Sequence, residues 1–147
     1  MNRDEIIIKI AERVHECLRQ IHNTTGENRP NIRTTKDKSW IKNHGTDQID
    51  TAATDYALLP SDWQAERKIG AEIALDAIID HTKMGLPLDK NFIEQTSGIL
   101  HAKWLERNSG RATIAQKNSY EILPESEKEK DRAFVLAAIA VHKSLQG

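Results

Sequence analysis

The sequence predicts an all-α fold made of four main helices, arranged as two pseudo-repeated helix pairs with a long loop in the N-terminal half. Three observations lead to this prediction. Apolar residues recur at helical spacing in four separate stretches of the chain. Capping residues, prolines and glycines delimit these stretches. The same order of motifs also occurs in both halves of the chain, which indicates an internal duplication.

The composition is typical of a globular protein, with 38% hydrophobic and 29% charged residues in a chain of 147. We therefore expect residues 1–147 to form a single domain. The net charge of −1 gives no general attraction to a DNA or RNA polymer or to an anionic membrane. The single cysteine, Cys17, cannot form an internal disulfide, and no apolar run reaches the length of a membrane span. These features predict a cytoplasmic location.

The first apolar stripe predicts a helix over residues 4–22, for which Asp4 is a suitable N-cap. The stretch that follows is polar over residues 23–38 and contains Gly26 and Pro30, which indicates a loop. Trp40 and Ile41 interrupt it and a turn is expected at residues 44–47, so residues 23–58 form a long connection without a strong helix signal. Loops of this length in compact domains are often binding loops. The apolar positions of the predicted helix are Ile6, Ile7, Ile10, Val14, Leu18 and Ile21.

Two more helices are expected in the middle of the chain, over residues 61–81 and 89–108. Ser61 and Gln64 form a capping-box pattern at the start of the first of these. Asp89 is a suitable N-cap for the second. Both stretches carry apolar residues at helical spacing after their caps.

The fourth helix is expected over residues 125–145, and Glu125 at its start suits the helix dipole. Its later part, residues 133–141, is apolar nearly all round, which is typical of a buried helix. Ala138 and Ile139 lie in this part, so we expect both to be almost fully buried.

A helix with a histidine, a Tyr-x-x-Leu-Pro motif and a second helix occur twice, within residues 4–82 and within residues 89–145. These two segments are therefore predicted to be an internal repeat. The matched residues are His15 and His101 on the first helix of each pair, and residues 56–60 and 120–124 for the motif.

The stretch from Phe92 to Leu145 resembles the ryanodine-receptor repeat domain of bacterial or phage type. Residues 101–104 match the His-x-x-Trp pattern of that family, and residues 120–132 match its Tyr-x-x-Leu-Pro-x-x-Glu-Lys-x-x-Asp-Arg block. Residues 109–119 lack the Gly-Trp-x-Tyr-Gly and Lys-x-His-Pro segments of the family. The N-terminal half matches more weakly, through His15, Tyr56, Leu59, Pro60 and Lys68.

The family is not known as a catalytic fold. The resemblance therefore implies a module of helix pairs, with a site for an adenine nucleotide or a nucleotide-derived signal.

Trp104 is the leading candidate for contact with such a ligand. An indole face can stack on a base, and Arg107 lies one helical turn further on the same surface, where a guanidinium can bind phosphate. The alternative is that Trp104 covers the core.

Trp40 is the second aromatic candidate, because it lies in the long polar stretch among basic residues that include Arg33. An aromatic residue among cations suits the binding of a phosphate-bearing ligand. The alternative is a solvated loop that one tryptophan anchors. The basic residues of the cluster are Arg29, Arg33, Lys36, Lys38 and Lys42. We expect Trp104, Arg107 and this cluster to line one cavity.

His101, Tyr120, Tyr56 and Arg132 complete the candidate ligand-binding set. Each also has a structural interpretation. A histidine on an apolar helix face is usually a buried hydrogen-bonding residue. The two tyrosines are expected to fix their turns onto a helix through the hydroxyl and the ring. Arg132 suits a structural ion pair as well as contact with a ligand.

The sequence carries no zinc-protease, Walker or dinucleotide-binding motif, so no catalytic residue, metal or cofactor is expected. We predict a non-catalytic binding domain for an adenine-nucleotide or cyclic-nucleotide-like signal. It is expected to act as a sensor or a sequestering protein in phage defence or counter-defence, and a homo-oligomer is compatible with this role. The alternatives are a structural or protein–protein interaction module and, third, a hydrolase that uses His44, Asp47 and Asp50.

Overall fold

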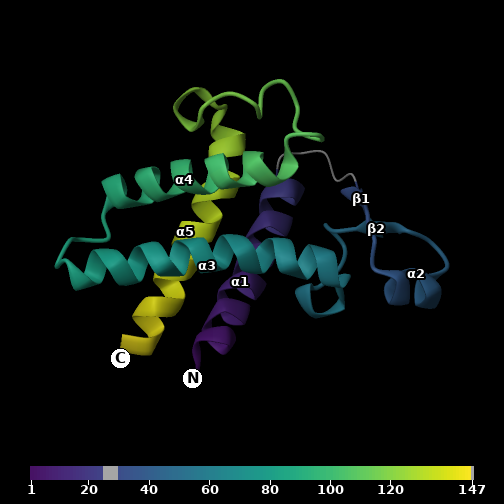
Figure 1. Cartoon of the computed structure of the whole chain (residues 1–147), viewed down its shortest axis with the longest axis horizontal. Helices are drawn as coiled ribbons and strands as arrows, with labels where there is room; N and C mark the ends of the chain where they lie inside the picture. Colours follow the sequence, from purple (N-terminus) through teal and green to yellow (C-terminus); the bar gives the residue numbers. More distant parts are fainter. Residues whose placement is uncertain (25–29, 147) are drawn as a thin grey trace. The chain divides into compact units, whose positions relative to one another are not determined.

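Four long helices account for most of the chain (Figure 1). The computed structural model describes residues 1–24 and 30–146. Every long helix begins and ends within two residues of its predicted bounds, so these four predictions are confirmed, and the chain is mostly helical. The helices are α1 (Arg3–Thr24), α3 (Ser61–Lys83), α4 (Lys90–Asn108) and α5 (Glu125–Gln146). No helix in the described ranges is long and apolar enough to cross a membrane.

The expectation of a long loop over residues 23–58 is wrong for the described part of that stretch. Two strands pair there in antiparallel fashion, with Arg33 opposite Ile49, and enclose a short helix. The strands are too short to show an alternating pattern in the sequence. Gly26 and Arg29 lie outside the described residues. The elements are β1 (Ile32–Thr34), α2 (Lys38–His44), β2 (Gln48–Asp50) and the 3-10 turn η1 (Tyr56–Leu58).

Two aspartates tie this hairpin to the first turn of α3. Asp37 caps α2 by accepting from the Trp40 backbone N–H at 3.1 Å, and it also accepts from the Ser61 backbone N–H at 2.9 Å. These two backbone donors hold the pKa of Asp37 below its ordinary value. Asp62, in the first turn of α3, accepts from the Thr35 hydroxyl at 2.6 Å and from the Lys36 backbone N–H at 2.9 Å on the hairpin side. The start of each helix is therefore stabilised by a carboxylate that also bonds the other segment.

Thr35 lies at the centre of this exchange and is only 4% exposed. Its hydroxyl donates to Asp62 and accepts from the Asp37 backbone N–H at 3.0 Å. Thr35→Val keeps the shape and removes both bonds, so we expect the free energy of unfolding to fall by about 1–3 kcal/mol. Urea denaturation measures this change. Thr34→Val is the matched control on an exposed strand position, and an equal loss in both variants would contradict the role given to the Thr35 hydroxyl.

The chain forms two compact units, Met1–Ile69 (unit 1) and Gly70–Gly147 (unit 2). Their boundary lies within α3, whereas the predicted repeats meet between residues 82 and 89. In unit 1, α1 packs against η1. The buried hydrophobic residues of unit 1 are Ile7, Ile10, Ala11, Val14, Ile49, Tyr56 and Leu59.

The core of unit 2 forms where α4 packs against α5 and against the 3-10 turn η2 (Tyr120–Ile122). The Phe134 ring lies directly over Gly70, where any side chain would collide with it. Ala138 is 0% exposed and Ile139 is 8% exposed, so the predicted burial of both residues is confirmed.

Candidate functional site

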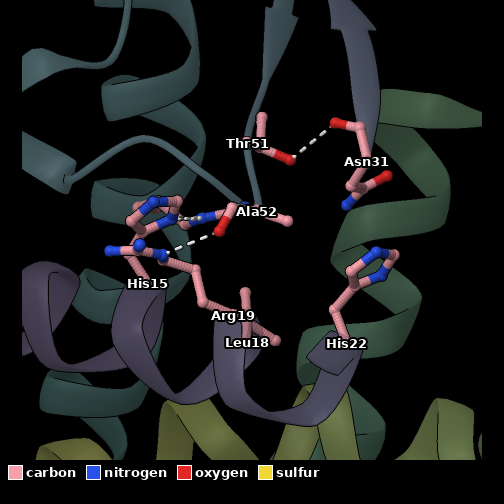
Figure 2. Close-up of a pocket in the computed structure, with 8 residues that line it drawn as sticks. His15, Leu18, Arg19, His22, Asn31, Thr51 and Ala52 are labelled. Atoms are coloured by element: carbon pink, nitrogen blue, oxygen red, sulfur yellow. Dashed lines mark hydrogen bonds between the residues drawn. The ribbon is translucent and has the colours of Figure 1, made fainter. Parts of the chain in front are cut away.

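A cleft in unit 1 runs along one face of α1 (Figure 2). His15, Leu18, Arg19 and His22 share this face because positions three and four apart on a helix are neighbours. His15 and Arg19 lie at one end of the cleft in the view of Figure 2, and His22 and Asn31 lie at the other. The remaining lining residues are Thr51 and Ala52 from the chain after β2, and Arg67 from α3.

The cleft is small. The space open to the centre of a water molecule is about 20 Å³, and the whole hollow, including its part open to solvent, is about 190 Å³. The first figure is enough for about one water molecule. Sites that enclose a whole drug-sized ligand have roughly 300–1,000 Å³. The cleft therefore has room for a small group of a ligand and not for a whole nucleotide.

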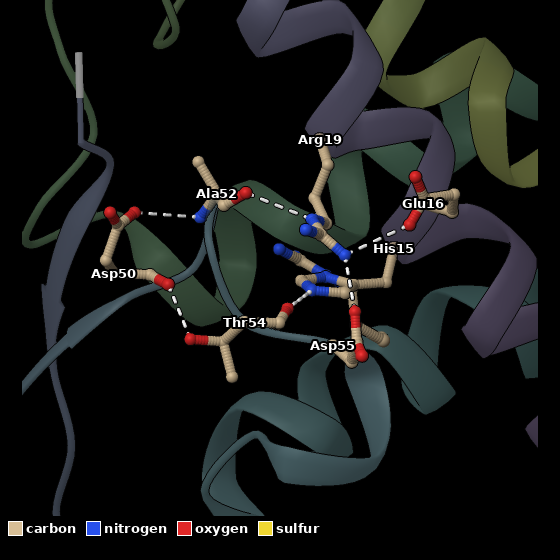
Figure 3. A network of polar contacts seen from close by, with 8 residues as sticks. His15, Glu16, Arg19, Asp50, Ala52, Thr54 and Asp55 are labelled. Carbon is tan, nitrogen blue, oxygen red and sulfur yellow. Dashed lines mark hydrogen bonds and ion pairs between the residues drawn. The ribbon is translucent and has the colours of Figure 1, made fainter. Parts of the chain in front are cut away.

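Asp50 positions the chain that forms one wall of the cleft. Its carboxylate accepts from the backbone N–H groups of Asn31 and Ala52, each at 3.0 Å. Its carbonyl accepts from the Thr54 hydroxyl at 2.8 Å (Figure 3). Thr51 closes the same turn by donating its hydroxyl to the Asn31 carbonyl at 3.1 Å. The wall is thus held by bonds made within unit 1.

Arg19 is held against this wall by three bonds (Figure 3). Its Nε donates to the Ala52 carbonyl at 3.0 Å. Its Nη1 pairs with Asp55 at 2.7 Å and with Glu16 at 3.1 Å, and both carboxylates are mostly exposed. All three bonds use Nε or Nη1. Arg19 therefore has a fixed position at the cleft.

His15 is almost fully buried beside Arg19 and Arg67. Its Nε2 donates to the Thr54 carbonyl at 2.7 Å, and its Nδ1 accepts from Arg67 Nε at 3.3 Å. Burial lowers the pKa of His15, and the positive charges of Arg67 and Arg19 lower it further. The imidazole is therefore neutral, and it locates Arg67 at the cleft.

The matched histidine of unit 2 has a carboxylate in place of the arginine. The Nε2 of His101 donates to the Asn118 carbonyl at 2.9 Å, and its Nδ1 lies 3.7 Å from Asp131. Burial, with a smaller contribution from nearby Glu127, raises the pKa of Asp131 to about 7. Both histidines therefore use Nε2 to hold a backbone carbonyl two residues before a Tyr-x-x-Leu-Pro motif.

Arg132 lies between carboxylates in unit 2. It binds Glu94 through two bonds of 2.8 and 2.6 Å, and Glu125 through one of 2.7 Å. Its hydrogen bonds to Glu94 lower the pKa of that carboxyl to about 2. The Tyr120 hydroxyl donates to the same carboxylate at 3.0 Å, and burial together with this bond raises the pKa of Tyr120 to about 12. Arg132 is thus an ion-pairing residue, which is one of its two predicted roles.

The tyrosines differ between the two units. Tyr120 fixes its turn onto α4 through the bond to Glu94, as predicted. The hydroxyl of Tyr56 is buried and has no hydrogen-bond partner within the described part of the chain. The prediction that the Tyr56 hydroxyl fixes its turn onto a helix is therefore wrong. Burial raises the pKa of Tyr56.

The predicted aromatic candidates belong to different units. Trp104 is half-buried on α4, and its ring lies nearly parallel to that of His101, with 6.4 Å between centroids. Arg107 is exposed and donates to the Lys103 carbonyl at 3.2 Å. Whether these residues share a cavity with the Trp40 cluster stays a prediction.

In unit 1, the ring of Trp40 stacks on that of His44 at 3.9 Å between centroids. Arg33 is exposed on β1 and donates to the Ile32 carbonyl at 3.1 Å. His44 also engages the Trp40 carbonyl, and Asp50 holds the wall of the cleft. Two of the three side chains suggested for a hydrolase, His44 and Asp50, thus make contacts that stabilise the hairpin.

Sequence reasoning missed Arg19, Arg67 and His22 as cleft residues. A signal for Arg67 was present, because it is the seventh residue after Pro60, as Asp131 is after Pro124. Comparison of the chain with protein-family models, with curated proteins and with solved structures gives no match.

Proposed function

We propose that this chain is a non-catalytic binding module for a small anionic ligand of the nucleotide type, such as an adenine nucleotide or a cyclic-nucleotide-like signal. The observation that carries the proposal is the cleft of unit 1. Within the described residues, its lining contains two arginines and no carboxylate. Guanidinium groups at a cleft can donate charge-assisted hydrogen bonds to an anionic ligand.

The proposed internal duplication supports an anion-binding site in the first half of the chain. Each half has a buried histidine that holds a backbone carbonyl ahead of a buried tyrosine. Arg67 stands beside the histidine of the first half, and Asp131 stands beside that of the second. We infer that the first copy of the repeat became the anion-binding copy, while the carboxylates of the second copy engage its own arginine. The resemblance to ryanodine-receptor repeat domains supports the same class of ligand.

Trp104 of unit 2 is proposed as a stacking surface for an adenine base, independently of the cleft in unit 1. Stacking on an aromatic ring contributes on the order of 1–3 kcal/mol by alanine substitution. Trp104→Ala is therefore expected to weaken binding of an adenine nucleotide about tenfold to a hundredfold. Calorimetric titration measures the affinity, and thermal denaturation of the same variant measures its stability.

Arg107→Ala is the companion variant for the phosphate, and Trp63→Ala is the control tryptophan, because its indole donates to the Thr34 carbonyl. A large fall in melting temperature for Trp104→Ala with unchanged affinity would show that Trp104 only covers the core. In that case the stacking role would be abandoned.

A protein–protein interaction module is the second candidate function. Leu58 and Ile122 occupy matched positions in η1 and η2, and each is 67% exposed. Exposed apolar side chains at matched positions suit contact with another protein. This candidate predicts that Leu58→Ser and Ile122→Ser abolish binding to a partner while nucleotide titrations give no heat.

A further inference from the structure

The two matched histidines need different numbers of protons to satisfy their partners. In unit 1, the His15 ring lies between an acceptor, the Thr54 carbonyl, and a donor, the Nε–H of Arg67. A neutral imidazole has one N–H and one lone pair, so it satisfies both partners at once. The contact that holds the Thr54 carbonyl therefore needs no added proton.

In unit 2, the His101 ring lies between two acceptors. Its Nε2 bonds the Asn118 carbonyl at 2.9 Å, and its Nδ1 lies 3.7 Å from the Asp131 carboxylate. A neutral imidazole has only one N–H for these two oxygens. One added proton removes the shortage, either as an imidazolium beside a carboxylate or as a carboxylic acid that donates to Nδ1.

Burial makes this shortage costly. The side chains of His101 and Asp131 are only 6% and 15% exposed, so water does not replace a missing donor for either of them. A buried acceptor that loses its donor costs its full desolvation penalty. Loss of the shared proton therefore sets the Asn118 carbonyl and the Asp131 carboxylate in competition for one N–H.

The charged groups near the pair make the proton titrate close to neutral pH. Burial raises the pKa of Asp131 to about 7, and Glu127 of α5 adds to this rise while Lys130 opposes it. On α4, the His101 ring faces the uncharged ring of Trp104. The η2 side contributes Tyr120, whose hydroxyl is bonded to Glu94, a carboxylate that Arg132 balances.

The carbonyl that His101 holds belongs to the loop of residues 109–119, between α4 and η2. This loop has a turn of its own, in which Thr113 and Gln116 each accept the backbone N–H of the other through their side chains. Gln116 also donates to Glu127 of α5 at 3.3 Å, which is longer than the bond to Asn118. The bond from His101 is thus the shorter of these two ties, and it lies directly before η2.

We propose that residues 109–119 form a proton-controlled latch, in which the proton shared by His101 and Asp131 holds the Asn118 end of the loop on α4 and its loss releases that end. The latch is closed at acidic pH and open at alkaline pH. The matched segment of unit 1, which His15 holds through Thr54, stays in place over the same range. This regulation belongs to unit 2 and does not rest on the ligand proposed above.

The test is hydrogen exchange of the full chain at about pH 5.5 and about pH 8.5, with each rate divided by that of the unfolded sequence at the same pH. We expect the protection of the Asn118 and Ile122 amides to fall about tenfold at the higher pH. The Ala53 and Leu58 amides, which lie beside Thr54 in unit 1, should keep their protection. They are the internal control.

Asp131→Asn is the decisive variant. An amide has nearly the shape of the carboxyl group, donates to Nδ1 and does not titrate between these pH values. The variant should therefore retain the protection of Asn118 and Ile122 at the higher pH. Asp80→Asn, at an exposed carboxylate of α3 in the same unit, is the matched control and should lose protection as the parent chain does.

Equal protection of Asn118 and Ile122 at both pH values in the parent chain would overturn the latch. So would an equal loss in the control amides of unit 1, or a loss that persists in Asp131→Asn. If Asp131→Asn does not fold, Glu127→Gln decides, because it removes the negative charge beside Asp131. The midpoint of the loss should then move to lower pH, and an unmoved midpoint would rule the latch out.

Discussion

Replacing Ala138 by aspartate is expected to lower the free energy of unfolding by several kcal/mol. Ala138 is 0% exposed in the apolar part of α5. A carboxylate there must either remain charged without water or take up a proton, and both are costly. Total stabilities of domains are roughly 5–15 kcal/mol, so the loss removes a large share. Urea denaturation followed by circular dichroism measures it.

Leu136→Asp is the matched control, because Leu136 lies on the same helix and is exposed. That carboxylate stays in water, so we expect a change within about 0.5 kcal/mol. If Ala138→Asp melts within a degree or two of the parent chain, Ala138 does not occupy a closed core.

The second large effect is expected at Asp131, whose pKa is raised from 3.8 to about 7 in the folded protein, chiefly by burial. Between these two values the folded state keeps a proton that the unfolded state has released. Stability should therefore fall as pH rises from about 4 to 7. The difference in pKa corresponds to roughly 4 kcal/mol.

Asp131→Asn removes this titration, so the variant should be more stable than the parent chain at pH 8 and should vary less between pH 4 and 7. Denaturation curves at several pH values measure the difference. Asp80→Asn, an exposed carboxylate of the same unit, is the control. The carboxyl of Glu94 affects stability in a different pH range. Its pKa is lowered to about 2, so its contribution to the free energy of unfolding is lost only below pH 4.5. Parallel pH profiles for parent and Asp131→Asn would contradict the raised pKa.

The long helices could be predicted because their signals are local. A cap such as Asp89 and an apolar stripe occur within one stretch of sequence, and the structure places the cap as expected, with its carboxylate accepting from the Phe92 backbone N–H. The hairpin could not be predicted in this way. Its strands have three residues each, and its stability comes from bonds between Thr35, Asp37 and Asp62, which only the folded chain brings together.

The candidate site was predicted less well than the helices for the same reason. Trp104 and Trp40 are noticeable in the sequence because tryptophan is rare, but the cleft contains no tryptophan, and half of its lining residues are histidine or arginine. Arg19 and Arg67 are far apart in the chain, and in the folded protein the bonds to Ala52 and His15 help to hold them at one hollow. A closer comparison of the two halves would have identified Arg67 as a candidate site residue, because an aspartate, Asp131, occupies the matching position in the second half.

The exchange of bonds between Asp37 and Asp62 has a consequence for how this sequence can evolve. Each carboxylate serves donors on the other's segment, so the loss of either one leaves unpaired backbone or hydroxyl groups on both sides. A single substitution at position 37 or 62 is therefore deleterious even when the new residue suits its own segment. Because Asp37 and Asp62 serve different donors, the loss of both leaves more groups unpaired than the loss of one, and descendants of this chain should keep both carboxylates.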